Sequence, residues 1–178
     1  TIKSFSLQSL TQANNFCIFK KIKNMSCALW ISGKNLDVDK LTKKLSIKPC
    51  AIYKKGEPLF KLKPNGRKYY DSGMSFSPSK ASFDRLDKQI KDTIRFLQKH
   101  NKSLKKLTTN KDTDSSVIDF GIYLRMGYNN IIAQSDYFPS ELLKLAGDLK
   151  IDLGLSLYPP LQDEQMKKRF TKFNQNKK

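Results

Sequence analysis

Residues 151–158 have the sequence Ile-Asp-Leu-Gly-Leu-Ser-Leu-Tyr, in which apolar residues alternate with polar or small ones. A period of two is typical of a β-strand with one buried face, because successive side chains point to opposite sides of the sheet. The pattern predicts that one face is buried and consists of Ile151, Leu153, Leu155 and Leu157. The opposite face then carries Asp152, Gly154, Ser156 and Tyr158.

Three predicted helices can supply the layer that covers this buried face. Asp37 is a suitable N-cap for a first helix, which ends before Pro49. Ser82 opens a second helix, and Pro139 with Ser140 begins a third that runs to about Leu149. The second helix has the strongest apolar stripe, which continues past a break at Asn101 and consists of Phe83, Leu86, Ile90, Ile94, Leu97, Leu104 and Leu107.

Further strands are predicted at 27–31, 69–76, 117–126 and 131–135. Residues 50–68 are predicted to form a loop, in which the Asn65-Gly66 turn joins 69–76 to a strand around 59–62 as a hairpin. Strands and helices therefore alternate along the chain. This order predicts an α+β fold: a mainly antiparallel sheet with helices packed on one face, of the ferredoxin-like or split β-α-β type.

The chain of 178 residues is long enough for one ordinary domain, which we expect at 25–160. Residues 1–24 have no sustained periodicity and precede Met25, so they are expected to be an N-terminal arm or an upstream extension. Residues 161–178 are rich in Lys, Asn and Gln and are expected to form a basic C-terminal tail.

The formal net charge of +18 suits a nucleic-acid-binding protein, because a positive field attracts polyanions and releases their counterions. However, 29 of the 34 basic residues are Lys, which lacks the planar fork with which Arg contacts phosphates and bases in bidentate fashion. The chain is also rich in Asn and Ile, as an AT-rich genome produces without selection for binding. The charge therefore leaves both interpretations open.

The three cysteines, Cys17, Cys27 and Cys50, are odd in number and show no C-x-x-C spacing. With His100 as the single histidine, they predict neither a disulfide framework nor a metal site, and we expect no cofactor. A reducing, cytoplasmic location fits this composition best. No stretch of 18 apolar residues is present, so a spanning helix and a membrane partner are not expected.

Four motifs together resemble the bacterial family called domain of unknown function 4279. They are the segments at 36–49 (Leu-Asp-Val-Asp-Lys-Leu-Thr-Lys-Lys-Leu-Ser-Ile-Lys-Pro), 54–57 (Lys-Lys-Gly-Glu), 82–89 (Ser-Phe-Asp-Arg-Leu-Asp-Lys-Gln) and 149–158 (Leu-Lys-Ile-Asp-Leu-Gly-Leu-Ser-Leu-Tyr). The resemblance covers about residues 27–158. It implies a compact cytoplasmic α+β domain of bacteria or their mobile elements, sometimes suspected of an immunity or partner-binding role, and no reaction.

A basic, aromatic segment after the first helix is the first candidate site. Cations suit a phosphate backbone and aromatic rings suit base stacking. The alternative interpretation is that the aromatic side chains pack inward while the lysines are solvated. The candidate residues for anion or nucleic-acid binding are Lys48, Tyr53, Lys54, Lys55, Lys61, Lys63, Arg67, Lys68, Tyr69 and Tyr70.

The polar face of the predicted sheet is the second candidate, as a docking surface for a protein; plain solvent exposure is the alternative. Its residues are Asp119, Tyr123, Asp152, Ser156 and Tyr158. Because no nucleophile elbow or phosphate-binding loop is present and His100 stands alone, we expect no enzyme. The leading hypothesis is a bacterial, non-enzymatic module that binds a protein partner; the alternative is nucleic-acid binding through residues 48–70 and the basic tails. The sequence does not define the oligomeric state.

Overall fold

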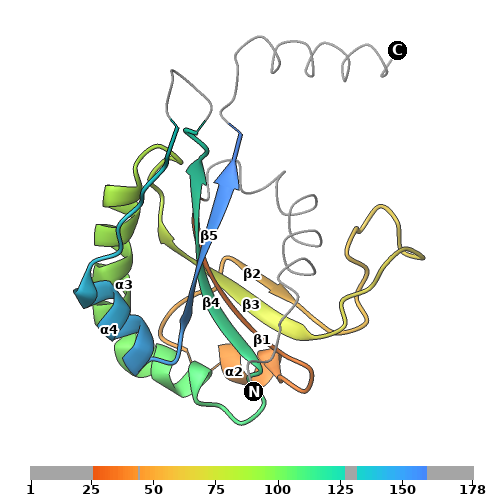
Figure 1. The fold of residues 1–178 in the computed structure, drawn as a ribbon. Helices are drawn as coiled ribbons and strands as arrows, with labels where there is room; N and C mark the ends of the chain where they lie inside the picture. Colours follow the sequence, from red (N-terminus) through yellow and green to blue (C-terminus); the bar gives the residue numbers. More distant parts are fainter. Residues whose placement is uncertain (1–25, 44, 127–131, 160–178) are drawn as a thin grey trace, which may run out of the picture.

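The structure is a computed structural model that describes residues 26–43, 45–126 and 132–159 (Figure 1). In chain order its elements are β1 (Cys27–Gly33), α2 (Val38–Thr42), β2 (Ala51–Tyr53), β3 (Ser72–Ser79), α3 (Leu86–Thr108), β4 (Ser115–Tyr123), α4 (Ser140–Asp148) and β5 (Asp152–Tyr158). The expected arm at 1–24 and tail at 161–178 lie outside the described residues.

The five strands of the described residues form one sheet in the order β2-β3-β1-β4-β5, with β1 at its centre. Three neighbouring pairs are antiparallel, and β4 pairs with β5 in parallel. A parallel pair needs a crossover connection, which here contains α4. The predicted α+β class with a mainly antiparallel sheet is confirmed. The narrower ferredoxin-like assignment stays a prediction. The parallel pairing of β5 with β4 was not predicted from the sequence.

One apolar cluster joins the helices to one face of the sheet. Leu29 of β1, Phe76 of β3 and Phe120 of β4 are at most 1% exposed and belong to the same cluster as Leu97 of α3 and Leu142 of α4. Figure 1 shows α3 and α4 together on one side of the strands. The sequence prediction that the helices pack on one face is therefore confirmed.

Helix α3 has the predicted apolar stripe but different limits. It runs without interruption through Asn101, so the predicted break is wrong. Asn costs a helix at most about 0.7 kcal/mol, which the burial of Leu104 and Leu107 beyond it outweighs. The helix begins at Leu86, four residues after Ser82, whose carbonyl oxygen accepts from the backbone N–H of Arg85 in a preceding turn.

Strand β5 is confirmed, but two of its leucines are not in the core. Leu153 packs against the apolar cluster, whereas Leu155 is 41% and Leu157 is 52% exposed. Helix α4 has nine residues and is about 13 Å long, while the seven residues of β5 extend about 23 Å. The helix is therefore too short to cover the whole strand.

Several element limits differ from the sequence prediction. Residues 132–135 form no strand, and Ile131 lies outside the described residues. Residues 51–53, predicted as loop, form the short strand β2, and β3 begins at Ser72 instead of residue 69. Residues 59–62 form no strand, although an isolated bridge from Pro58 to Lys68 keeps the hairpin connection.

The first helix ends at Thr42, and its predicted cap is confirmed, because Asp37 accepts from the Lys40 N–H.

Candidate binding sites at the two edges of the sheet

Residues 54–69, which connect β2 to β3, form a hairpin that we call the basic arm. Its stem is a short two-stranded ribbon. The N–H of Leu59 donates to the carbonyl oxygen of Arg67, and the N–H of Tyr69 donates to the carbonyl oxygen of Glu57, each at 2.9 Å. Two successive turns close its tip. In the first, the N–H of Lys63 donates to the carbonyl oxygen of Phe60, and in the second, the N–H of Gly66 donates to the carbonyl oxygen of Lys63. In Figure 1 the arm projects beyond the sheet on the right.

The arm gathers six of the seven predicted basic residues: Lys54, Lys55, Lys61, Lys63, Arg67 and Lys68. All six are exposed, and Glu57 is the single acidic residue among them. Lys48 is also exposed but precedes β2. Lys54 lies 2.6 Å from Asp39, and the hydrogen bond to this carboxylate raises the pKa of Lys54. Because both groups are exposed, the pair contributes little to stability.

The predicted aromatic residues are divided between the interior and the surface. The rings of Tyr53 and Tyr69 stack with their centroids 4.4 Å apart, and Tyr53 is only 7% exposed. Burial raises the pKa of the Tyr53 hydroxyl. Tyr70 is 54% exposed. For Tyr53 and Tyr69 this arrangement agrees with the inward-packing interpretation.

A buried carboxylate at the base of the arm was missed by the sequence analysis. Asp71 is 5% exposed and accepts hydrogen bonds from Ser32 and Tyr70, but its burial outweighs them and raises its pKa. Ser32 also bonds to the Tyr53 hydroxyl. These contacts attach the residues on either side of the arm, Tyr53 before it and Asp71 after it, to the central strand β1. An isolated Asp before a strand gives no sequence signal for such a role.

At the opposite edge of the sheet, β4 and β5 bring together four of the five predicted partner-surface residues. In the parallel register Asp119 is opposite Gly154, and Tyr123 is opposite Tyr158, on one face. The Ser156 hydroxyl reaches both oxygens of Asp119, and burial raises the pKa of this carboxylate despite that bond. Asp152 is exposed at the start of β5, where it lies opposite Val117 in the same register.

Phe83 belongs to this face and not to the helix stripe in which the sequence analysis placed it. Its ring contacts those of Tyr123 and Tyr158, with centroid distances of 5.4 and 5.0 Å. A Cβ at Gly121 would lie 2.8 Å from the Phe83 ring, so only glycine leaves room for it. Phe83 precedes the first residue of α3, and for this reason helical spacing misplaced it.

The outer side of β5 is an edge of the sheet. The Tyr158 carbonyl oxygen accepts from the Leu124 N–H at 2.7 Å, which directs the main-chain groups of Tyr158 toward β4. These groups alternate in direction along a strand, so the N–H and C=O groups of Leu153, Leu155 and Leu157 point outward. In the part of the chain that the structure describes, no further strand pairs with them.

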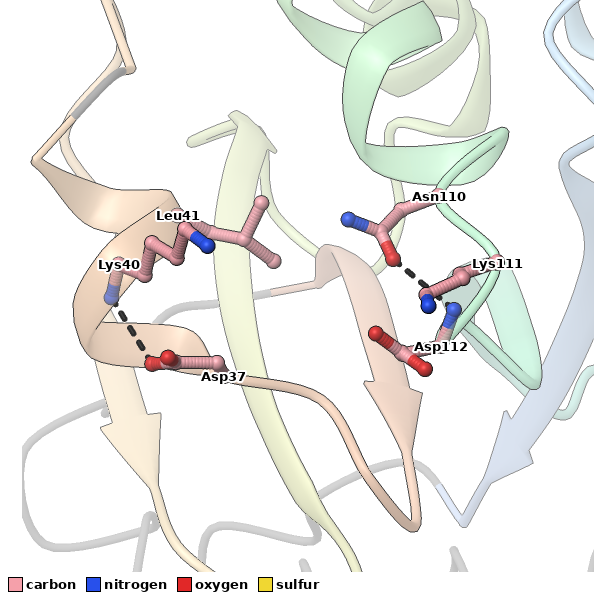
Figure 2. A pocket seen from close by; sticks show the side chains of 6 residues that line it. All are labelled: Asp37, Lys40, Leu41, Asn110, Lys111 and Asp112. Carbon is pink, nitrogen blue, oxygen red and sulfur yellow. Dashed lines mark hydrogen bonds between the residues drawn. The ribbon is translucent and has the colours of Figure 1, made fainter.

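A cleft of about 500 Å³ lies between α2 and the α3–β4 connection (Figure 2). Its lining consists of Asp37, Lys40, Leu41, Asn110, Lys111 and Asp112. Asp37 caps α2 through the Lys40 N–H, and the Asn110 side chain accepts from the Asp112 N–H, both at 2.9 Å. These polar groups therefore hold the backbone at each side of the cleft.

Within the described ranges, no group of His, Cys, Asp and Glu side chains could hold a metal ion, and no helix is long and apolar enough to cross a membrane. His100 packs against Phe96 with a centroid distance of 4.9 Å, and burial lowers its pKa.

A protein family described as a domain of unknown function (DUF4279) matches residues 21–160, in agreement with the resemblance seen in the four sequence motifs. No curated protein and no solved structure gives a significant match.

Proposed function

Because the chain belongs to the DUF4279 family, whose description assigns no activity, we propose from its geometry that the protein is a non-enzymatic module that binds a protein partner. The partner adds an extended strand to the outer edge of β5. This mode of recognition uses main-chain hydrogen bonds for affinity and alternate side chains for specificity.

The observation that carries the proposal is the apolar outer edge of β5, with which no strand of the described residues pairs. Three residues direct their main-chain donors and acceptors outward, and Leu155 and Leu157 expose about half of their surface on one side. Asp152 is the single charged residue in the strand. Exposed edges usually contain Lys or Pro, or are very short, because an open edge invites pairing with another chain. Strand β5 has seven residues and neither Lys nor Pro.

The opposite edge of the sheet differs in these respects. Strand β2 has only three residues and leads directly into Lys54 and Lys55. One apolar side chain, Ile52, is 45% exposed there. Ile52 is therefore a matched control for Leu157, with similar exposure on the edge that the proposal does not use.

We further infer that the module acts in the bacterial cytoplasm. Cys27 and Cys50 are both free thiols, as expected in a reducing compartment.

Site-specific photocrosslinking in cells of the native host tests the proposal. A photoreactive amino acid at Leu157 should give a discrete covalent adduct with a second polypeptide, and the same group at Ile52 should not. Leu155→Pro should abolish the adduct, because proline removes one outward-facing donor while its neighbours keep their bonds to β4. Far-UV circular dichroism checks that this variant remains folded.

The absence of an adduct at Leu157 would contradict the proposal. So would equal adducts at both positions, or an adduct that persists in Leu155→Pro.

A further inference from the structure

The basic arm is a second site, on the edge of the sheet remote from β5. We propose that it binds the phosphate backbone of duplex DNA, with the ribbon inserted along the major groove. The proposal rests on the shape of the arm and on the position of its charges. It is independent of the protein partner at β5.

The shape of the arm suits this groove. Its stem is a two-stranded antiparallel ribbon, with Pro58 and Lys68 paired between the two flanking hydrogen bonds. The major groove of B-form DNA is about 12 Å wide and admits either a helix or a two-stranded ribbon. The equivalent groove of an RNA duplex is deep and narrow, which disfavours it as a ligand.

The charges follow the whole length of the ribbon. Lys55 lies at its base, Arg67 and Lys68 in its stem, and Lys61 and Lys63 at its tip. All five are exposed, and none of them forms a salt bridge with another residue that the structure describes. Cations distributed from base to tip allow the ribbon to contact several phosphates along a duplex.

Two other polyanions fit less well. Single strands bind by stacking successive bases on several exposed aromatic rings, but Tyr53 and Tyr69 stack on each other, and of the three candidate tyrosines Tyr70 alone is exposed. A loop that inserts into an anionic membrane needs several exposed apolar side chains at its tip. Here Leu62 is 95% exposed, while Leu59 is buried and Phe60 is partly buried.

Fluorescence anisotropy of the full chain with a labelled 20-base-pair duplex at about 50 mM salt tests the proposal. Binding should weaken steeply with salt, with a slope of log K against log salt of up to about −4.5 if all five cations contact phosphates. Lys61→Glu/Lys63→Glu should weaken binding at least tenfold and reduce that slope by about two. Phosphatidylserine vesicles are titrated in parallel.

The matched control is Lys99→Glu/Lys102→Glu, which changes the net charge equally at two exposed positions of α3. It should weaken binding less than about threefold, because charges that make no direct contact are screened by salt. Equal losses in both variants would show that only the net charge attracts DNA and would overturn the proposal. Failure of the wild type to bind at low salt, or binding to vesicles alone, would overturn it as well.

Discussion

The Ser156 hydroxyl lies between the two carboxylate oxygens of Asp119, at 2.8 and 2.9 Å. This contact joins β4 to β5 on the face of the sheet opposite the helices. Burial raises the pKa of Asp119 above its usual value, and the hydrogen bond from Ser156 opposes that rise. The serine therefore reduces the cost of keeping this carboxylate charged in the folded protein.

Ser156→Ala is expected to lower the free energy of unfolding at pH 7 by about 1 kcal/mol, the lower end of the cost of leaving a buried polar group without its partner, because this contact is only partly buried. The loss should shrink below about pH 4, where Asp119 is protonated in both states. A carboxyl whose folded pKa is raised loses stability as pH rises through that pKa, and removing the serine raises the pKa further. Urea unfolding across this pH range measures the difference, with Ser156→Thr as the control that keeps the hydroxyl. A loss independent of pH would contradict this account.

Gly73→Ala is expected to destabilise the fold by about 1–3 kcal/mol through overpacking. A Cβ at this position would lie 2.6 Å from Cζ of Tyr53 and 2.8 Å from the Ile31 carbonyl oxygen. Gly147→Ala is the matched control, since a Cβ there meets nothing within 4 Å and alanine favours the helix by about 0.5–1 kcal/mol. The two substitutions should shift the melting temperature in opposite directions. A rise for Gly73→Ala would disprove the close packing of Tyr53.

Gln89→Glu is expected to cost about 3 kcal/mol at pH 7 and less near pH 4. The Gln89 side chain is fully buried, and its Nε2 donates to the carbonyl oxygens of Ser82 and Gly121, both at 3.0 Å. A carboxylate would face these two acceptors, whereas a protonated carboxyl can donate to one of them. Gln98→Glu on the exposed side of α3 removes the hydrogen bond from Gln98 to Glu141 and adds a like charge beside it, and it should still cost at most about 1 kcal/mol because both groups are exposed. Equal effects in chemical denaturation would contradict the bridging role of Gln89.

Cys27 is expected to react with iodoacetamide at least about 100-fold more slowly than Cys50 in the native protein. Burial raises the pKa of the Cys27 thiol to about 12, and the thiolate is the reactive form. Cys50 is exposed. Mass spectrometry of the Cys17→Ser protein follows both sites, and their rates should converge in denaturant. Rapid native labelling of Cys27 would show that β1 opens without global unfolding.

The sequence predicted the fold class because its strongest patterns lie where the packing is strongest. The stripe of α3 and the alternation in β4 and β5 are local signals, and burial reinforces them. The first and last residues of an element were less predictable where tertiary contacts determine them. Strand β2 has only three residues, and it forms because β3 offers partners for its main chain.

The residues of the candidate sites were predictable from the sequence, but their arrangement in space was not. The lysines of the basic arm are visible in the sequence, but the inward stacking of Tyr69 depends on where Tyr53 enters the sheet. The exposure of Leu155 and Leu157 depends on the length of α4 relative to β5, which strand periodicity does not report. The burial of Asp71 arises from residues distant in sequence, Ser32 among them.

The central position of β1 has a consequence for folding during synthesis. One neighbour of this strand, β3, begins at Ser72, and the other, β4, begins at Ser115. The ribosome therefore releases an apolar strand whose second partner emerges some eighty residues later, and long-range pairing of this kind is slow. Until β4 is complete, the main-chain groups on that edge of β1 remain without their strand partner and available to chaperones and to other nascent chains.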